Sequence, residues 1–256
     1  MTSLPVSGLQ LMVRQPASLD ELAVLETDKA PPLAILDLAS RVVAQSDGTS
    51  VGWDSLPASE VGAVALAIRR AWIGDALLTD GWCPEPECGQ RIDVSFRLGE
   101  YLEHFAPSVP STVEVAGDSW YKLAGEEVRF RVPTVADLVG ALHAVDSAAA
   151  LSAACVLPAE LNDEQWPKVD AALEELSPNL DGVVGGRCPE CGSLMQLRFE
   201  PCGYVITELR DLFAGLYFEV HLLARTYGWS EADILAMGRS RRIKYAHLIA
   251  EEMAAR

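Results

Sequence analysis

Two pairs of cysteines, far apart in the chain, most constrain how this protein can fold. Cys83 and Cys88 enclose four residues in the string Cys-Pro-Glu-Pro-Glu-Cys-Gly, and Cys188 and Cys191 enclose two in Cys-Pro-Glu-Cys-Gly. Both strings have the form of zinc knuckles, in which a tight turn points two thiolates at one place, and Zn²⁺ takes four such ligands in a tetrahedron. The sequence therefore predicts one structural zinc site built by these four cysteines.

The long separation of the two pairs requires an insertion between the two halves of the predicted site. There are 99 residues between Cys88 and Cys188, far more than a compact zinc ribbon holds. After each pair, at 91–98 and 194–199, comes a segment with the sequence character of a β-strand. The pairs would close a small zinc-ribbon-like antiparallel β element, and the chain from about 100 to 187 would leave it as an insertion and return.

Other interpretations of the cysteines were weighed against zinc. A redox Cys-x-x-Cys pair normally begins a helix in a βαβ unit, whereas strands follow here. A disulfide framework is disfavoured in a reducing compartment. Cys155, within an alanine-rich run, is most simply a small buried hydrophobe, and Cys202, 11 residues after Cys191, stays open as a substitute ligand. Four thiolates leave no position for water on the metal, so the predicted site is structural and not catalytic.

The charge of the chain limits its partners. It carries 37 acidic and 20 basic residues, a formal net charge of −17, which disfavours a nucleic-acid-binding surface and repels anionic membranes. The N-terminus lacks a basic segment followed by an apolar run, and no stretch approaches the roughly 18 apolar residues of a membrane span. We expect a cytoplasmic protein that binds neither nucleic acid nor membrane.

The patterning predicts an α+β fold that is mainly helical. Apolar residues recur at helical spacing in several segments, and alternate in a few short ones. Expected are a short helix at 34–44, helices at about 57–78, 135–145, 147–156, 163–176, 209–227, 231–237 and 239–254, and a further strand at 127–132. Four regions follow: a loosely ordered, proline-punctuated N-terminal segment at 1–50; a helix, the first knuckle and a strand at 51–103; a mainly helical insertion at 104–187; and the second knuckle, a strand and C-terminal helices at 188–256.

Motifs for catalysis are missing from the sequence. The four histidines are scattered, and the chain has no His-Glu-x-x-His, deaminase, Gly-x-Ser-x-Gly, Walker or Gly-x-Gly-x-x-Gly pattern. We therefore expect no catalytic residues and no small-molecule substrate. A zinc- or thiol-dependent enzyme and a zinc-ribbon regulatory protein stay open as alternatives.

The C-terminal quarter resembles a known family. Residues 219–237 read EVHLLARTYGWSEADILAM and are followed at 241–245 by RRIKY. This string resembles the ending of baseplate-hub assembly proteins of contractile-tailed phages and related contractile injection systems. The passage FRVPT at 130–134 and the cysteine knuckles are also similar to family members, and the similarity lies mainly in 58–145 and 180–250. The resemblance implies a non-enzymatic assembly factor or baseplate component whose partners are other tail or hub proteins.

The same quarter holds the candidate partner-binding residues. From 225 to 256 there are six basic and four acidic residues, against the acidic remainder of the chain. Arg239, Arg241, Arg242 and Lys244 form a basic cluster at the start of the last helix. This cluster is a solvated face, a docking patch for an acidic partner, or a clamp on the protein's own acidic body. The aromatic residues beside the preceding helix break either anchor two helices, which we favour, or face a partner. The candidates are Tyr227, Trp229, Arg239, Arg241, Arg242 and Tyr245.

Overall fold

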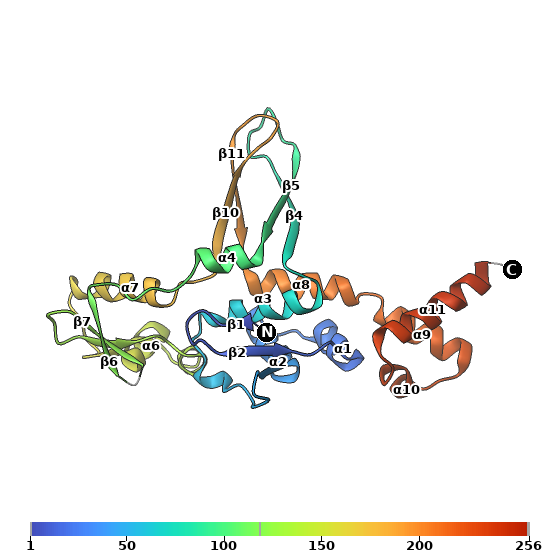
Figure 1. Cartoon of the computed structure of the whole chain (residues 1–256), viewed down its shortest axis with the longest axis horizontal. Coiled ribbons are helices and arrows are strands. Elements are labelled where there is room, and N and C mark those ends of the chain that lie inside the picture. The colour runs from blue at the N-terminus through green and yellow to red at the C-terminus, as the bar shows by residue number, and fades with distance from the viewer. Residues whose placement is uncertain (1, 118, 255–256) are drawn as a thin grey trace.

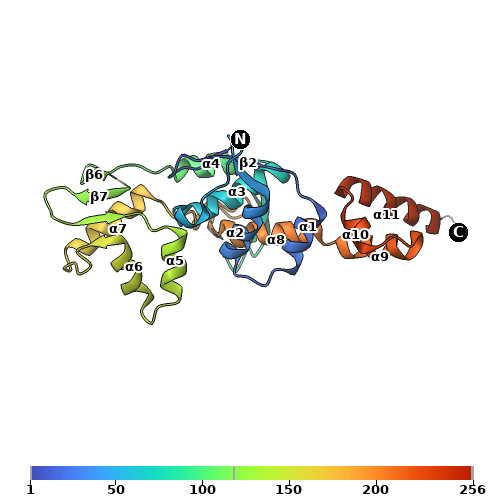
Figure 2. The same cartoon turned by 90° about the horizontal axis from the view of Figure 1, so that it is seen from below.

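Helices outweigh strands in the computed structural model, which describes residues 2–117 and 119–254, with 47% helix and 20% strand. This confirms the coarse expectation of a mixed fold with small antiparallel sheets and a C-terminal helical region. Figure 2 shows three bodies along the long axis: an inserted unit at one end, a central body, and a C-terminal helical unit at the other end.

The central body is organised around α3 (Glu60–Trp72). Every residue of α3 from 63 to 69 is buried, and a helix that is buried on all sides must be surrounded by other elements. Its main neighbours are α2 (Pro31–Val42) and α8 (Pro201–Phe213), and α1 (Ser18–Glu26) packs on α8. Because α8 follows the insertion and the other three helices precede it, the body joins distant parts of the chain.

The N-terminal segment is ordered, which corrects the expectation for residues 1–50. Besides α1 and α2 it forms a three-stranded antiparallel sheet of β1 (Thr2–Ser3), β2 (Gln10–Val13) and β3 (Val43–Gln45). Leu4, Leu11 and Ile35 lie in the body's core at 1% exposure or less. The prolines mark element boundaries and do not interrupt elements: Pro31 opens α2, where a missing N–H costs nothing.

Two antiparallel hairpins rise from the body side by side and form what we call the arm (Figure 1). The first consists of β4 (Ala76–Trp82) and β5 (Arg91–Arg97), the second of β10 (Gly182–Arg187) and β11 (Leu194–Phe199). They are separate two-stranded sheets. The expected helix at 57–78 is therefore too long. It ends at Trp72, and Gly74, with φ of +124°, turns the chain into β4.

Contacts at the root of the arm fix where the hairpins start. The guanidinium of Arg69, on α3, forms two 2.9 Å hydrogen bonds with Glu208 of α8 and donates to the carbonyl oxygen of Ala76, at the start of β4, at 2.7 Å. On the other side, the ring of Phe199 meets those of Phe96 and Tyr101 edge to face, with centroids 5.3 and 5.2 Å apart. The α3–α8 packing thus sets the positions of both hairpins.

The inserted unit has a core of its own, centred on Phe130, which is completely buried. Beside its three helices it contains a four-stranded antiparallel sheet, of which only one strand was expected. The strands in sheet order are β6 (Val113–Gly117), β7 (Trp120–Leu123), β8 (Arg129–Arg131) and β9 (Val156–Leu157); the helices are α5 (Val135–Leu142), α6 (Ser147–Cys155) and α7 (Gln165–Leu176). These strands are too short to show a clear alternation, which is why only β8 was expected.

Short helices connect and complete these bodies. The 3-10 helix η1 (Trp53–Ser55) precedes α3, and α4 (Leu98–His104) continues from β5 at the base of the arm. The C-terminal unit contains α9 (Leu216–Tyr227), α10 (Glu231–Leu235) and α11 (Arg239–Ala254). The single helix expected at 209–227 is two helices, α8 and α9, because the chain breaks at Ala214 and Gly215. None of the helices among the described residues is both long and apolar enough to cross a lipid bilayer.

Candidate functional site

The four cysteines of the two knuckles meet at the tip of the arm. Cys83 comes directly after β4, and Cys188 directly after β10. Each loop is closed by a backbone hydrogen bond of the same kind, from the Cys83 N–H to the Gln90 carbonyl oxygen at 2.8 Å and from the Cys188 N–H to the Ser193 carbonyl oxygen at 2.9 Å. Each hairpin therefore presents its cysteine loop at the end farthest from the body.

Glycine ends each knuckle for a conformational reason. Gly89 and Gly192 have φ of +52° and +78°, a left-handed conformation that glycine adopts without steric cost. The longer first loop folds its additional residues into a turn, in which the N–H groups of Cys88 and Gly89 both donate to the carbonyl oxygen of Glu85 at 2.9 Å. The turn brings the sulfurs of Cys83 and Cys88 within 4.8 Å of each other despite the longer gap.

The distances between the sulfur atoms fit a tetrahedral metal site. The Sγ atoms of Cys83 and Cys191 are 3.5 Å apart, and those of Cys88 and Cys188 are 3.8 Å apart. All four Sγ atoms lie within 4.8 Å of one another. A tetrahedron with metal–sulfur bonds of about 2.3 Å has edges of about 3.8 Å, whereas a disulfide needs about 2.05 Å. The expectation that these four residues form one cluster is confirmed.

The thiols of this cluster oppose one another's ionisation. The backbone N–H of Glu85 lowers the pKa of Cys83, but burial and the three neighbouring thiols raise it to about 12. The pKa of Cys191 falls to about 6, because the hydroxyl and the N–H of Ser193 stabilise its thiolate. The thiolate of Cys191 therefore forms readily while Cys83 and Cys88 hold their protons more firmly, and a bound cation would favour the charged form of these thiols.

The two remaining cysteines lie in other places. Cys155 is buried in the core of the inserted unit, where burial raises its pKa to about 11. Cys202 is buried in the first turn of α8, and burial raises its pKa well above the usual range. The metal-ligand geometry found among the described residues includes only the four knuckle cysteines, so Cys202 does not replace one of them.

The three aromatic candidates of the C-terminal unit pack on one another. The rings of Tyr227 and Trp229 are stacked with centroids 4.7 Å apart, and Tyr245 of α11 meets Trp229 edge to face at 5.2 Å. Tyr227 is 40% exposed, and the other two are half-buried. The cluster joins α9 to α11, which agrees with the anchoring role favoured from the sequence.

Arg242 forms a buried clamp within the chain, and this corrects its assignment to a partner-binding surface. Its side chain is 1% exposed. It donates to a carboxylate oxygen of Glu21 on α1 and of Glu219 on α9, both at 2.6 Å, and to the hydroxyl of Ser18. Of the three possibilities left open for the basic cluster, the clamp on the acidic body is the one that Arg242 adopts.

The neighbouring arginines differ from Arg242 in their surroundings. Arg239 donates to the carbonyl oxygen of Leu212 at 2.7 Å and lies over the ring of Phe213, 5.5 Å from its centroid. Arg241 is exposed and lies over the ring of Tyr245 at 5.6 Å. Lys244 is exposed as well, so the basic cluster divides into two residues that face the body, Arg239 and Arg242, and two that face solvent.

The carboxylates of this clamp had no signal in the sequence. Glu21 stands among many acidic residues, more than 200 positions before Arg242. Burial raises the pKa of Glu21, and the positive charge of Arg242 opposes that rise. A buried, charged pair of this kind could be found only after the packing of α1 against the C-terminal unit was known.

Comparison with known proteins gives no relatives: no protein-family model matches the chain, and searches of curated proteins and of solved structures return no significant match.

Loss of the clamp should destabilise the protein strongly. Replacing Arg242 by Met removes the cation that hydrogen-bonds to the buried Glu21 and the half-buried Glu219, and leaves Glu21 only Arg239, at 3.9 Å. We therefore expect the free energy of unfolding, measured by urea titration, to fall by about 3–5 kcal/mol. The matched control is Arg241→Ala, which removes an exposed arginine one residue away and should change it by less than about 0.5 kcal/mol. Equal effects of the two substitutions would contradict the clamp.

Proposed function

We propose that Cys83, Cys88, Cys188 and Cys191 hold one structural Zn²⁺ as thiolates. The observation that supports this most directly is the sulfur geometry, with the 3.5 and 3.8 Å separations near the tetrahedral edge. Zinc is favoured over other metals because four thiolates in a tetrahedral arrangement suit Zn²⁺ or an iron–sulfur centre, and knuckle loops of this form are typical of zinc. The two hairpins would then form a zinc-ribbon-like element that is closed at its tip.

The metal would act as a cross-link between two distant segments of the chain. The apolar cluster at the tip is small, with Cys83, Cys188 and Met195 as its buried members. So little buried apolar surface gives the tip little stability of its own. A bound metal would supply the missing stabilisation and would keep the two hairpins side by side.

We further propose that the protein works by binding other proteins, as an assembly factor or baseplate component of a phage-tail-like contractile system. This rests on the resemblance of the C-terminal string and on the closed four-thiol shell, which offers no open position for substrate or water. Its direct partners would be other tail or hub proteins. It would meet them in the cytoplasm during assembly, or remain with them in the particle.

Metal analysis tests the zinc site. We expect about one zinc per chain in the purified protein, and a loss of zinc with a fall in Tm for Cys188→Ser, since metal binding contributes to folding. Cys155→Ala is the matched control, because it removes a buried thiol outside the cluster and should retain the zinc. Protein without zinc, or zinc that a chelator removes without any change in Tm, would contradict the proposal.

The assembly role predicts a genetic context and a phenotype. The gene should lie beside sheath, tube and baseplate genes, and its deletion should leave the sheath and tube proteins produced while sedimentable particles disappear. Complementation with the wild-type protein serves as the control. Neighbouring genes of a metabolic pathway, or particles of normal number and shape in the deletion strain, would argue against this role and favour the enzyme alternative.

A further inference from the structure

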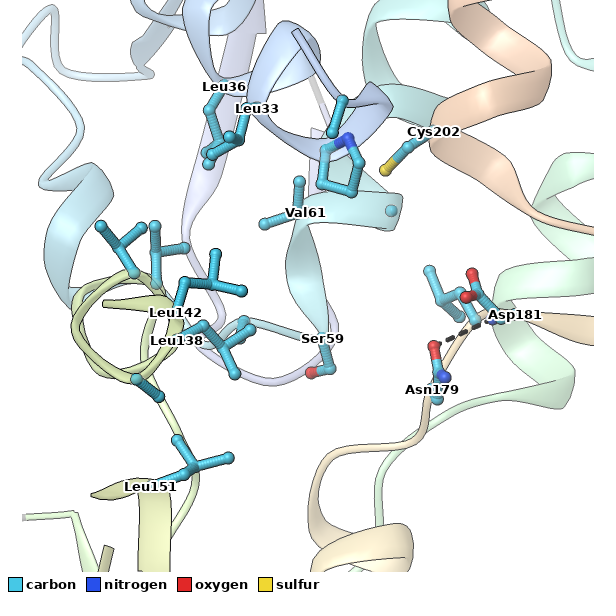
Figure 3. A pocket seen from close by; sticks show the side chains of 18 of the residues that line it. Leu33, Leu36, Ser59, Val61, Leu138, Leu142, Leu151, Asn179, Asp181 and Cys202 are labelled. Carbon is cyan, nitrogen blue, oxygen red and sulfur yellow. Dashed lines mark hydrogen bonds between the residues drawn. The ribbon is translucent and has the colours of Figure 1, made fainter. Parts of the chain in front are cut away.

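An apolar cavity of about 550 Å³ lies between the central body and the inserted unit. Figure 3 shows its walls: Leu33 and Leu36 of α2 and Val61 of α3 on the side of the body, and Leu138 and Leu142 of α5 across from them. The two bodies approach each other beside it through a β-bridge between Pro57 and Thr134. The cavity is therefore a groove between two separately folded parts of the chain.

The α5 side of this groove is an uncovered apolar helix face. Among the residues of α5 only Val135 and Ala141 are buried. Leu138 is 40% exposed, Leu142 is 70% exposed, and the apolar surface continues past the end of the helix to Val145, which is fully exposed. The apolar surface thus extends beyond the cavity. A small molecule that filled the 550 Å³ would leave part of this surface exposed.

The opposite end of the groove is acidic. Asp181 and Glu200 line this end, and among the described residues no lysine, arginine or histidine lines the groove. The Glu200 carboxylate already accepts the N–H groups of Cys202 and Gly203 at the start of α8. No hydrogen bond to the Asp181 carboxylate is found among the described residues. Burial, followed by the charge of Glu200, raises its pKa, and the positive charge of Arg198, which does not line the groove, opposes that rise. A cationic side chain placed there could form an ion pair with the Asp181 carboxylate, which accepts no hydrogen bond from the described residues.

We propose that this groove is the docking site for an amphipathic helix of a partner protein, with its apolar face on α5 and a lysine or arginine at Asp181. The proposal rests on the assembly role proposed above and names the contact surface for it. Charge complementarity selects the basic residue, because the groove has two carboxylates and no cation. The uncovered leucines on both sides select the apolar face.

The lining of the groove favours a helical partner segment over an extended one. The lining residues belong to helices and to loops, and none belongs to a strand of the described sheets, so a β-strand could not add to a sheet edge here. An extended segment would leave its backbone N–H and C=O groups buried without partners among these apolar side chains. A helix satisfies these groups internally, and only its side chains need to match the groove.

A peptide titration tests the proposal with the full chain. The probe is a fluorescein-labelled amphipathic peptide of Leu and Lys, about 15 residues long so that it can form a helix, followed by fluorescence anisotropy at about 0.15 M salt to screen the overall negative charge. Leu142→Gln should weaken binding about tenfold, the effect of one buried leucine. The matched control is Leu78→Gln, an exposed leucine of β4, and it should leave binding unchanged.

A second pair of variants tests the acidic end. Asp181→Asn should weaken binding of the Leu/Lys peptide about threefold to fivefold, as expected for a partly exposed ion pair. It should not affect a Leu/Gln peptide with the same apolar face. Asp170→Asn, which removes an exposed carboxylate on α7, is the control. Circular dichroism of each variant verifies that it is folded.

Three outcomes would overturn the proposal. Leu142→Gln and Leu78→Gln could weaken binding equally, which would indicate general attraction to an acidic protein. Light scattering could show concentration-dependent dimers that Leu142→Gln abolishes, which would identify a second copy as the occupant. The Leu/Lys and Leu/Gln peptides could respond identically to Asp181→Asn, which would remove the cation from the account. Because the titration needs no tail protein, its failure is distinguishable from failure of the assembly role, which the deletion strain reports.

Discussion

The arrangement of the protein depends on one constraint: two hairpins separated by a long insertion must deliver four sulfur atoms to one point. The root of the arm meets half of this requirement. β4 begins four residues after α3 ends, and β11 leads almost directly into α8. The packing of α3 on α8, with the Arg69–Glu208 ion pair, sets both starting points. The tip meets the other half, through two loops that close with equivalent hydrogen bonds. Between root and tip the hairpins need only to be of similar length.

This division explains how an insertion can stand between two halves of one site. The inserted unit has its own buried core, and beside the groove it contacts the body through the Pro57–Thr134 bridge and a hydrogen bond between Ser59 and Ser177. The insertion therefore has a core separate from the arm, although Val135 of α5 belongs to the core of the central body. A cross-link that closes a loop of about 100 residues restricts the unfolded chain by about 4–5 kcal/mol in the chain-entropy account. A metal at the arm tip would stabilise the fold through the unfolded state as well as through its bonds.

The sequence predicted the parts of the fold that depend on residues close together in the chain. The cysteine spacing gave the cluster, the strand-like segments gave β5 and β11, and helical spacing gave α7 and α11 almost to the residue. Strand β4 was missed, because its sequence Ala-Leu-Leu-Thr-Asp-Gly-Trp lacks a clear period and follows a helix without a strong break. In the first 50 residues the helix expected at 34–44 corresponds to α2, but α1 and the three-stranded sheet were missed because prolines at element boundaries resemble prolines in loops. Arg242 was misplaced because its partners, Ser18, Glu21 and Glu219, come from two other elements.

The residues that stabilise the fold and those proposed to bind a partner lie in different places. The Arg242 clamp joins the C-terminal unit to α1; a metal at the arm tip would join the two hairpins, and the groove beside α5 is the surface we propose for a partner. Its central claim is that the arm tip is a tetrathiolate zinc site. Zinc K-edge X-ray absorption of the purified protein measures this most directly. The account predicts four sulfur neighbours at about 2.3 Å; a shell with nitrogen or oxygen ligands near 2.0 Å, or the absence of zinc from the folded protein, would contradict it.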